Sequence, residues 1–167
     1  MAEDDAFVEF VRSRSASLYR YAYLLAGNPH DADDLVQEAL IRLRSAWPRV
    51  RRQDDPIGYT RATIARLHVS AWRRRRRESV VAEVPETAFD ESGFHDAARR
   101  TALSKALAAL PPRQRAVIVL RFYEEQTEEE IAAILGISRG TVRSQAARAF
   151  AKLRATPQLE LLRGGTT

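Results

Sequence analysis

The sequence predicts an all-α protein in which two small helical domains are joined by an acidic linker and the second domain contains a helix-turn-helix. Apolar residues recur at helical spacing along most of the chain, and prolines and glycines divide that pattern into short helices. One intervening segment has no periodicity and carries six acids and no base. A length of 167 residues suits one ordinary domain or two small ones. We therefore expect domains at residues 5–77 and 97–160 and the linker at residues 78–96.

Composition argues against several classes of function. Hydrophobic residues make up 45% and charged residues 29% of the chain, which is typical of a soluble globular protein. There is no cysteine, and the three histidines show no ligand spacing, so we expect no metal site, no cofactor and no catalytic residue. The longest aliphatic run, Ala116 to Leu120, is too short to span a membrane, and the acidic start is unlike a signal peptide. These features predict a cytoplasmic protein without membrane insertion.

The distribution of charge points to a polyanionic partner. Residues 1–77 carry 15 arginines and ten acids, and residues 97–167 carry 12 bases and six acids. Of the 27 basic residues, 25 are arginine, which suits contacts with phosphates and guanine edges. An arginine-rich codon composition explains that preference equally well. A polyanionic partner is therefore inferred from where the basic residues lie, in two modules on either side of an acidic tether.

Two helices are expected at the start of the chain. The first spans Phe7 to Leu25 and is stopped by Gly27–Pro29. The second spans Asp31 to Trp47 and has the cleanest apolar stripe, with acids outward in its first turns and arginines in its later turns, the order that the helix dipole favours. A solvated helix face is the simplest interpretation of those charges. Pro48 is expected to end this helix and to begin a loop at Arg49 to Asp55.

A third helix is expected from Pro56 to Arg77, with Asp55 as its N-cap. It ends in five consecutive arginines, which repel one another unless an anion lies nearby. A nucleic-acid surface explains this run better than a solvated helix end, because arginines neutralise phosphates and an aromatic ring stacks on unpaired bases. The expected outward face consists of Tyr59, Thr63, Arg66, Ser70, Arg73 and Arg74.

The C-terminal half has the signals of a helix-turn-helix. Thr127 and Glu130 form a capping box, Gly136 permits a tight turn, and Ser138 caps the next helix. An ordinary helical hairpin with a polar face is the alternative. In a helix-turn-helix the second helix enters the major groove with its N-terminal side chains, whose division between bases and phosphates the sequence does not decide. Those side chains are Ser138, Arg139, Thr141, Arg143, Ser144, Gln145 and Arg148.

These segments together resemble the extracytoplasmic-function (ECF) sigma factors of bacterial RNA polymerase, over nearly the whole chain. The helix that docks on the clamp of the polymerase beta-prime subunit is similar to DADDLVQEALIRLRSAW. The adjoining helix, which meets the minus-ten promoter element and helps to open it, is similar to PIGYTRATIARLHVSAWRRRRR. The C-terminal domain that reads the minus-thirty-five element resembles LPPRQRAVIVLRFYEEQTEEEIAAILGISRGTVRSQAARAFAKL.

The resemblance implies partners and site residues. The partners are core RNA polymerase, through the beta-prime clamp and the beta flap, promoter DNA, and an inhibitory anti-sigma factor of the kind that commonly covers these surfaces. The loop at residues 49–55 would capture an unpaired promoter base, and the third helix would contact the minus-ten element. The clamp would meet Asp33, Asp34, Leu35, Gln37, Glu38 and Arg42, and the minus-ten DNA would meet Arg49, Arg51, Arg52, Tyr59, Arg66, Ser70, Arg73 and Arg74.

The sequence departs from the family pattern in two places. The family often has Asn and Asp where this chain has Arg66 and Ser70, and a Gly-Leu pair where it has Glu125 and Gln126. The first departure affects the minus-ten contacts, and the second leaves a less apolar entry to the helix-turn-helix.

Two other interpretations remain. A stand-alone helix-turn-helix transcription regulator would need a sensory domain, but the N-terminal half shows no strand-helix alternation and no ligand-binding glycine loop. A small nucleic-acid hydrolase would use Asp33, Asp34 and Glu38 as metal ligands. Those carboxylates lie early on one expected helix, with no complementary cluster elsewhere.

Overall fold

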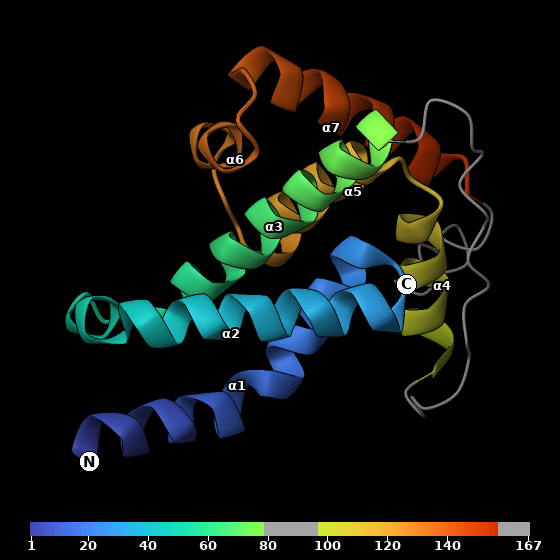
Figure 1. The fold of residues 1–167 in the computed structure, drawn as a ribbon. Coiled ribbons are helices and arrows are strands. Elements are labelled where there is room, and N and C mark those ends of the chain that lie inside the picture. The colour runs from blue at the N-terminus through green and yellow to red at the C-terminus, as the bar shows by residue number, and fades with distance from the viewer. Residues whose placement is uncertain (79–96, 157–167) are drawn as a thin grey trace, which may run out of the picture. The chain divides into compact units, whose positions relative to one another are not determined.

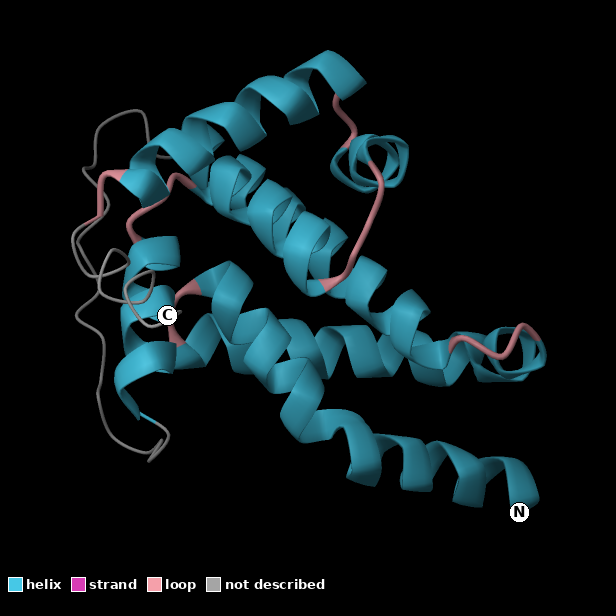
Figure 2. Cartoon of the chain, turned by 180° about the vertical axis from the view of Figure 1, so that it is seen from behind, coloured by secondary structure: helices cyan, strands magenta, loops and turns pink. Residues whose placement is uncertain are grey.

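The computed structural model describes residues 1–78 and 97–156 and divides the chain into two compact units, Met1–Glu78 and Ser79–Thr167. Within the described residues every regular element is a helix, and short loops join the helices (Figure 2). The expected all-α fold is therefore confirmed. The acidic linker expected at residues 78–96 lies outside the described residues, except for its first residue.

Unit 1 consists of three long helices, α1 (Ala2–Ala26), α2 (Pro29–Arg52) and α3 (Pro56–Glu78) (Figure 1). The turn between α1 and α2 places Gly27 at φ 79°, a left-handed conformation that glycine adopts without strain. The side chain of Asn28 then accepts a hydrogen bond from the Asp31 amide at 2.9 Å and caps α2. Local signals therefore reverse the chain and set α2 against α1.

The core of unit 1 is formed by one apolar stripe from each helix. The α1 side of it contains Tyr21, whose buried hydroxyl donates to the carbonyl of Arg61 in α3 at 3.2 Å. A second cluster near the end of α2 packs Leu43, Trp47 and Val50 against Phe7 and Phe10 of α1, among others. The stripe of α2 consists of Ala32, Leu35, Val36, Ala39, Leu43, Trp47 and Val50.

The expectation that Pro48 ends the second helix is wrong. Helix α2 continues through Pro48 to Arg52, so residues 49–52 form a helical turn and only Gln53–Asp55 form a loop. An interior proline removes one backbone hydrogen bond and costs about 3 kcal/mol. The extra turn places Val50 in the cluster around Trp47, and burial of its side chain there offsets part of that cost.

Helix α3 begins as predicted and buries a broader face than predicted. The Asp55 carboxylate accepts a hydrogen bond from the Gly58 amide at 3.0 Å, and Pro56 occupies the first helical position. Thr63, expected on the outward face, is buried, as is Thr60. Each threonine satisfies its hydroxyl by donating to the carbonyl four residues earlier, which permits burial of the side chain.

Unit 2 contains α4 (Ala97–Ala108), α5 (Pro112–Ile118), the π-helical turn η1 (Val119–Tyr123), α6 (Glu128–Leu135) and α7 (Arg139–Arg154). In Figure 1, α6 is seen end-on while α7 lies across the view, so these two helices cross steeply. The apolar residues that hold α5, η1, α6 and α7 together are Ala116, Val117, Val119, Leu120, Ile131, Leu135, Val142, Ala146 and Ala149.

Local signals define both ends of the helix-turn-helix, as predicted. Thr127 and Glu130 form the capping box. The Thr127 amide donates to the Glu130 carboxylate at 3.0 Å, and the Glu130 amide donates to the Thr127 hydroxyl at 3.2 Å. Gly136 closes α6 at φ 65°, and Ser138 caps α7 by accepting a hydrogen bond from the Thr141 amide at 3.1 Å. Glu125, one of the two departures from the family pattern, also lies in the left-handed region, at φ 53°.

Candidate functional site

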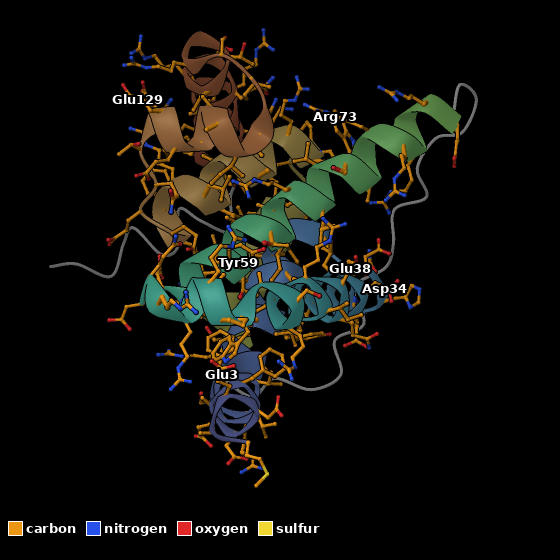
Figure 3. The ribbon with its side chains drawn as sticks, turned by 60° about the vertical axis from the view of Figure 1, so that its left-hand side comes forward. Glu3, Asp34, Glu38, Tyr59, Arg73 and Glu129 are labelled. Atoms are coloured by element: carbon orange, nitrogen blue, oxygen red, sulfur yellow. The ribbon has the colours of Figure 1, made fainter. Side chains whose placement is uncertain are left out.

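The acidic face of α2 is fixed by the helix's opposite, buried face. Since Leu35 and its neighbours in the stripe pack into the core, the polar residues of the same turns must point outward. Figure 3 shows Asp34 and Glu38 projecting together from α2. Leu35 is buried, so it supports this surface from below. The exposed candidate residues are Asp33, Asp34, Gln37, Glu38 and Arg42.

The charges of this acidic face are only partly compensated within the chain. Glu38 accepts from the Arg42 Nε at 3.1 Å, and the Asp34 carboxylate lies 3.5 Å from the His30 ring. All four side chains are about half exposed or more, so each pair contributes at most about 1 kcal/mol of stability. The acids therefore remain available to a basic partner surface.

Ile41, which was not among the predicted site residues, lies on the same outward face. Its side chain is 63% exposed, three and seven residues beyond Glu38 and Asp34 on the helix. An apolar side chain that stands off the buried stripe of an amphipathic helix is the signal that identifies it. The acidic face thus has an exposed apolar residue beside its acids, as expected of a protein-binding surface.

Three residues of the candidate minus-ten surface that were expected in a loop lie on a helix. Arg49, Arg51 and Arg52 occupy the last turn of α2 and are exposed, which corrects the expectation of a loop. The Arg49 guanidinium lies 6.0 Å from the centre of the Tyr59 ring. The structure therefore brings the end of α2 and the start of α3 together as one basic surface.

The rest of the candidate surface follows α3. Tyr59 is half-buried against the cluster of Leu43, Trp47 and Val50, so only part of its ring is open to a base. Arg66, Ser70, Arg73 and Arg74 are all exposed, and Figure 3 shows Arg73 on the last turns of α3. This face presents positive charge along several helical turns.

An ion pair joins the start of α2 to the end of α3. Arg75 donates to Asp31 at 3.0 Å, and Asn28 donates to the same carboxylate at 2.8 Å. Partial burial favours the neutral acid, but these hydrogen bonds and the charge of Arg75 outweigh it and lower the pKa of Asp31. The Asp31 carboxylate thus neutralises Arg75, one of the five consecutive arginines.

A groove of about 390 Å³ lies beside this ion pair, between α2 and α3. Its α2 wall is acidic and its α3 wall is basic. His30, Asp31 and Asp34 also bring potential ligand atoms within 4.8 Å of one another, a grouping that the sequence analysis did not foresee. Because Asp31 is engaged by Arg75 and the other two pair with each other, these contacts give no indication of a metal. The groove residues are Asp31, Asp34, Leu35, Glu38, Leu67, His68, Ala71, Arg74, Arg75 and Glu78.

Helix α7 presents a polar face opposite its buried residues. Arg139, Arg143, Ser144 and Arg148 are exposed, and Thr141 and Gln145 are half-buried. The hydroxyls of Ser138 and Thr141 lie 2.9 Å apart in the cap. The predicted residues therefore form one surface, although Ser138 and Thr141 already have intramolecular partners.

Two acids of α6 that the sequence analysis did not select contact this surface. The Glu128 carboxylate accepts from the Arg143 Nε at 2.8 Å, and the Glu129 carboxylate lies 3.2 Å from the Arg139 Nη1. Figure 3 shows Glu129 on α6. A sequence signal identifies these pairs: the first turn of α6 contains acids, and the first turns of α7 contain arginines.

Among residues 1–78 and 97–156, no helix combines the length and the hydropathy that a membrane crossing requires.

Comparisons with known proteins agree with this arrangement. Residues 10–78 match Sigma-70 region 2, and residues 106–155 match Sigma-70 region 4. The RNA polymerase sigma-E factor of Streptomyces coelicolor is 39% identical over 155 residues, which cover 92% of this chain and 87% of that protein. The RNA polymerase sigma factor SigV of Bacillus subtilis is 30% identical and covers 88% of each chain.

Among solved structures, the chain is similar to the sigma factor RpoE of Bartonella quintana, determined in complex with the anti-sigma factor NepR. The TM-score is 0.63, and the match covers 96% of this chain and 99% of that chain at 24% identity. At this identity the likeness concerns the fold.

Proposed function

Because this chain belongs to the ECF group of the sigma-70 family, we propose that it binds core RNA polymerase with one unit and reads promoter DNA with both. In this proposal residues 5–77 bind the core and open the minus-ten element, and residues 97–160 read the minus-thirty-five element. Residues 78–96 link the two. The protein acts in the cytoplasm and by binding alone, without catalysing a reaction.

The observation that carries this proposal is the separation of opposite charges on the helices of unit 1. Helix α2 presents Asp33, Asp34 and Glu38, whereas the outward face of α3 presents Arg66 and Arg73, and Arg74 lines the groove between the two helices. DNA repels the acidic face and attracts the basic one. A single unit with both faces is suited to hold a basic protein surface and a nucleic acid at the same time.

The acidic face has the composition of a clamp-binding site. Its charges steer a basic partner and set its orientation, and Ile41 supplies exposed apolar area next to them. Leu35 keeps the face in place from the core. We assign the beta-prime clamp to this surface and the beta flap to unit 2.

The basic face of unit 1 is suited to promoter opening. Arginines at the end of α2 and along α3 neutralise phosphates without discriminating among sequences. The exposed part of Tyr59, beside Arg49, offers an aromatic surface on which an unpaired base stacks. Capture of such a base would favour the open form of the minus-ten element.

Helix α7 is suited to the major groove. Its N-terminus is exposed, it crosses α6 steeply (Figure 1), and three of its four arginines lie in its first three turns. Gly140 in the first turn has room for a Cβ, whose nearest neighbour would be the Ser138 hydroxyl at 3.9 Å. Packing therefore does not require glycine here, and the open backbone allows close approach of a phosphate.

An anti-sigma factor is a further proposed partner. Both binding surfaces of this chain are strongly charged, so an inhibitor that covers them would prevent assembly and DNA binding together. The similar RpoE chain is seen with such a protein, NepR.

Run-off transcription with core polymerase tests the proposed function. We expect initiation from a defined position on a genomic promoter library only when this chain is added. Specific binding to duplex DNA without core, and no change in the start sites chosen by core, would instead identify a stand-alone regulator. Cleavage of DNA on addition of magnesium would identify a hydrolase.

A further inference from the structure

The two acid-arginine pairs between α6 and α7 differ in how firmly they are held. The side chain of Glu128 is 28% exposed, whereas that of Glu129 is 72% exposed. Both arginines are more than half exposed, so the difference lies in the carboxylates: solvent screens that of Glu129 more strongly than that of Glu128. Glu128 is therefore able to orient Arg143, and Glu129 has little hold on Arg139.

The backbone that carries Glu128 is itself fixed. Glu128 is the first residue of α6, directly after Thr127, and the capping box of Thr127 and Glu130 sets the geometry of that turn. Arg143 lies one turn into α7, beyond the Ser138 cap. Both partners of the pair thus stand on backbone that local hydrogen bonds define.

The bond between them uses one particular nitrogen. Glu128 accepts from the Nε of Arg143 at 2.8 Å, and the part of the chain that the structure describes shows no other partner for this guanidinium. The two terminal nitrogens are then left as a pair of donors for another partner. That fork matches the O6 and N7 acceptors of guanine in the major groove, the commonest specific contact of arginine with DNA.

We propose that Glu128 is a positioning residue that fixes Arg143 for end-on recognition of one guanine in the upstream promoter element. Arg139, which pairs with the exposed Glu129, contacts phosphate without selecting a base. This inference rests on the proposed function, since it assumes that α7 enters the major groove. The sequence did not decide which arginine of α7 contacts a base, and this inference assigns that role to Arg143. It also gives a role to Glu128, an acid that DNA would otherwise repel.

The test uses the complete holoenzyme and a promoter pool whose upstream element is randomised. Transcribed sequences are compared for the wild-type chain, Glu128→Gln and the matched control Glu129→Gln. We expect the wild type to prefer guanine at one position by about 5- to 150-fold. Glu128→Gln keeps a neutral acceptor in place of a charged one, and should reduce that preference about 3- to 10-fold at that position alone. Glu129→Gln should leave the preference within about twofold of wild type.

A second variant guards against misleading effects on folding. Arg143→Lys keeps the positive charge and removes the fork, so it should abolish the guanine preference while the chain still binds core polymerase normally. An unchanged preference in Glu128→Gln or in Arg143→Lys would overturn the inference and leave the proposed function intact. Uniformly stronger binding of all sequences by Glu128→Gln, with the preference retained, would also overturn it, because Glu128 would then only compete with DNA. A wild-type holoenzyme without any sequence preference in the upstream element would refute both the inference about Glu128 and the proposed reading of that element.

Discussion

The two units obtain their helix boundaries by different means. In unit 2, the ends of α6 and α7 follow from nearby residues: the Thr127–Glu130 box, Gly136 and Ser138. In unit 1, α2 continues through Pro48, and the one buried residue of its last turn, Val50, packs in a cluster with distant residues of α1 and α3. The comparison shows that short-range hydrogen bonds set the boundaries of α6 and α7, whereas tertiary packing sets the end of α2. The predictions below test this difference, beginning with the largest expected effect.

Removal of the packing beyond Pro48 should break unit 1. The Trp47 side chain is 3% exposed and its ring centre lies 5.4 Å from that of Phe7 and 5.6 Å from that of Phe10. Trp47→Ala should destabilise unit 1 by about 3–5 kcal/mol. Hydrogen exchange of the amides at residues 50–53 should also accelerate, because loss of the Trp47 ring opens the cluster in which Val50 is buried.

Ile41→Ala is the matched control for that experiment, since it truncates an exposed apolar residue of the same helix. Its effect on stability should stay within about 0.5 kcal/mol. Protected amides at residues 50–53 in Trp47→Ala would show that local propensity, and not packing, sustains the turn.

Loss of the capping box should affect unit 2 alone. Thr127→Ala removes the side chain that accepts from the Glu130 amide, and should cost about 1 kcal/mol. Both tryptophans of the chain, Trp47 and Trp72, lie in unit 1. The thermal transition seen by far-ultraviolet circular dichroism should therefore shift, while the tryptophan fluorescence transition should not. Thr127→Ser, which keeps the hydroxyl, should behave as the wild type, and a shifted fluorescence transition in Thr127→Ala would mean that the units do not unfold independently.

Acid should weaken unit 1 through Asp31. Because the folded state lowers the pKa of Asp31, its contribution to stability is complete above the usual value of 3.8 and is lost as the pH falls through the lower folded value. Asp31→Asn should therefore cost up to about 1 kcal/mol at neutral pH, and the difference from wild type should vanish at strongly acid pH. Urea titrations followed by tryptophan fluorescence measure both limits. A difference that persists below the folded pKa would assign the effect to the cap and not to the charge.

The smallest expected effect concerns backbone strain before the helix-turn-helix. Glu125 lies at φ 53° and Asp54, in the loop of unit 1, at φ 56°. Aspartate tolerates this conformation better than glutamate does. Glu125→Gly should stabilise unit 2 by about 0.5–1 kcal/mol, and Asp54→Gly should change unit 1 by less. Chemical denaturation compares the two; an equal or larger gain in Asp54→Gly would contradict this account.

The same contrast explains which parts of the fold were predictable. The helix-turn-helix depends on residues within three positions of each other, so its caps and its turn glycine follow from the sequence. The continuation of α2 does not, since a proline in isolation argues against it and the decisive residues, Phe7 and Phe10, lie some forty positions away. Thr63 was misplaced for a related reason, because burial of a hydroxyl depends on a backbone acceptor that only the folded helix supplies.

The candidate site was predictable to a similar extent. Helical periodicity identified which side chains of α2 and α7 are exposed, and therefore most members of both surfaces. It did not identify partners, since the pairs of Arg143 with Glu128 and of Arg75 with Asp31 join separate helices. These pairs distinguish arginines that periodicity treats as equivalent.

The most direct test of the division of labour between the units is the affinity of the full-length chain for core polymerase, measured by fluorescence anisotropy without DNA. Glu38→Arg reverses a charge on the acidic face and should weaken binding about tenfold or more. Glu9→Arg makes the same change at an exposed position of α1 and should alter binding by less than about twofold, as should Arg143→Ala in unit 2. Equal affinities for wild type and Glu38→Arg would contradict the assignment of core binding to the acidic face of α2.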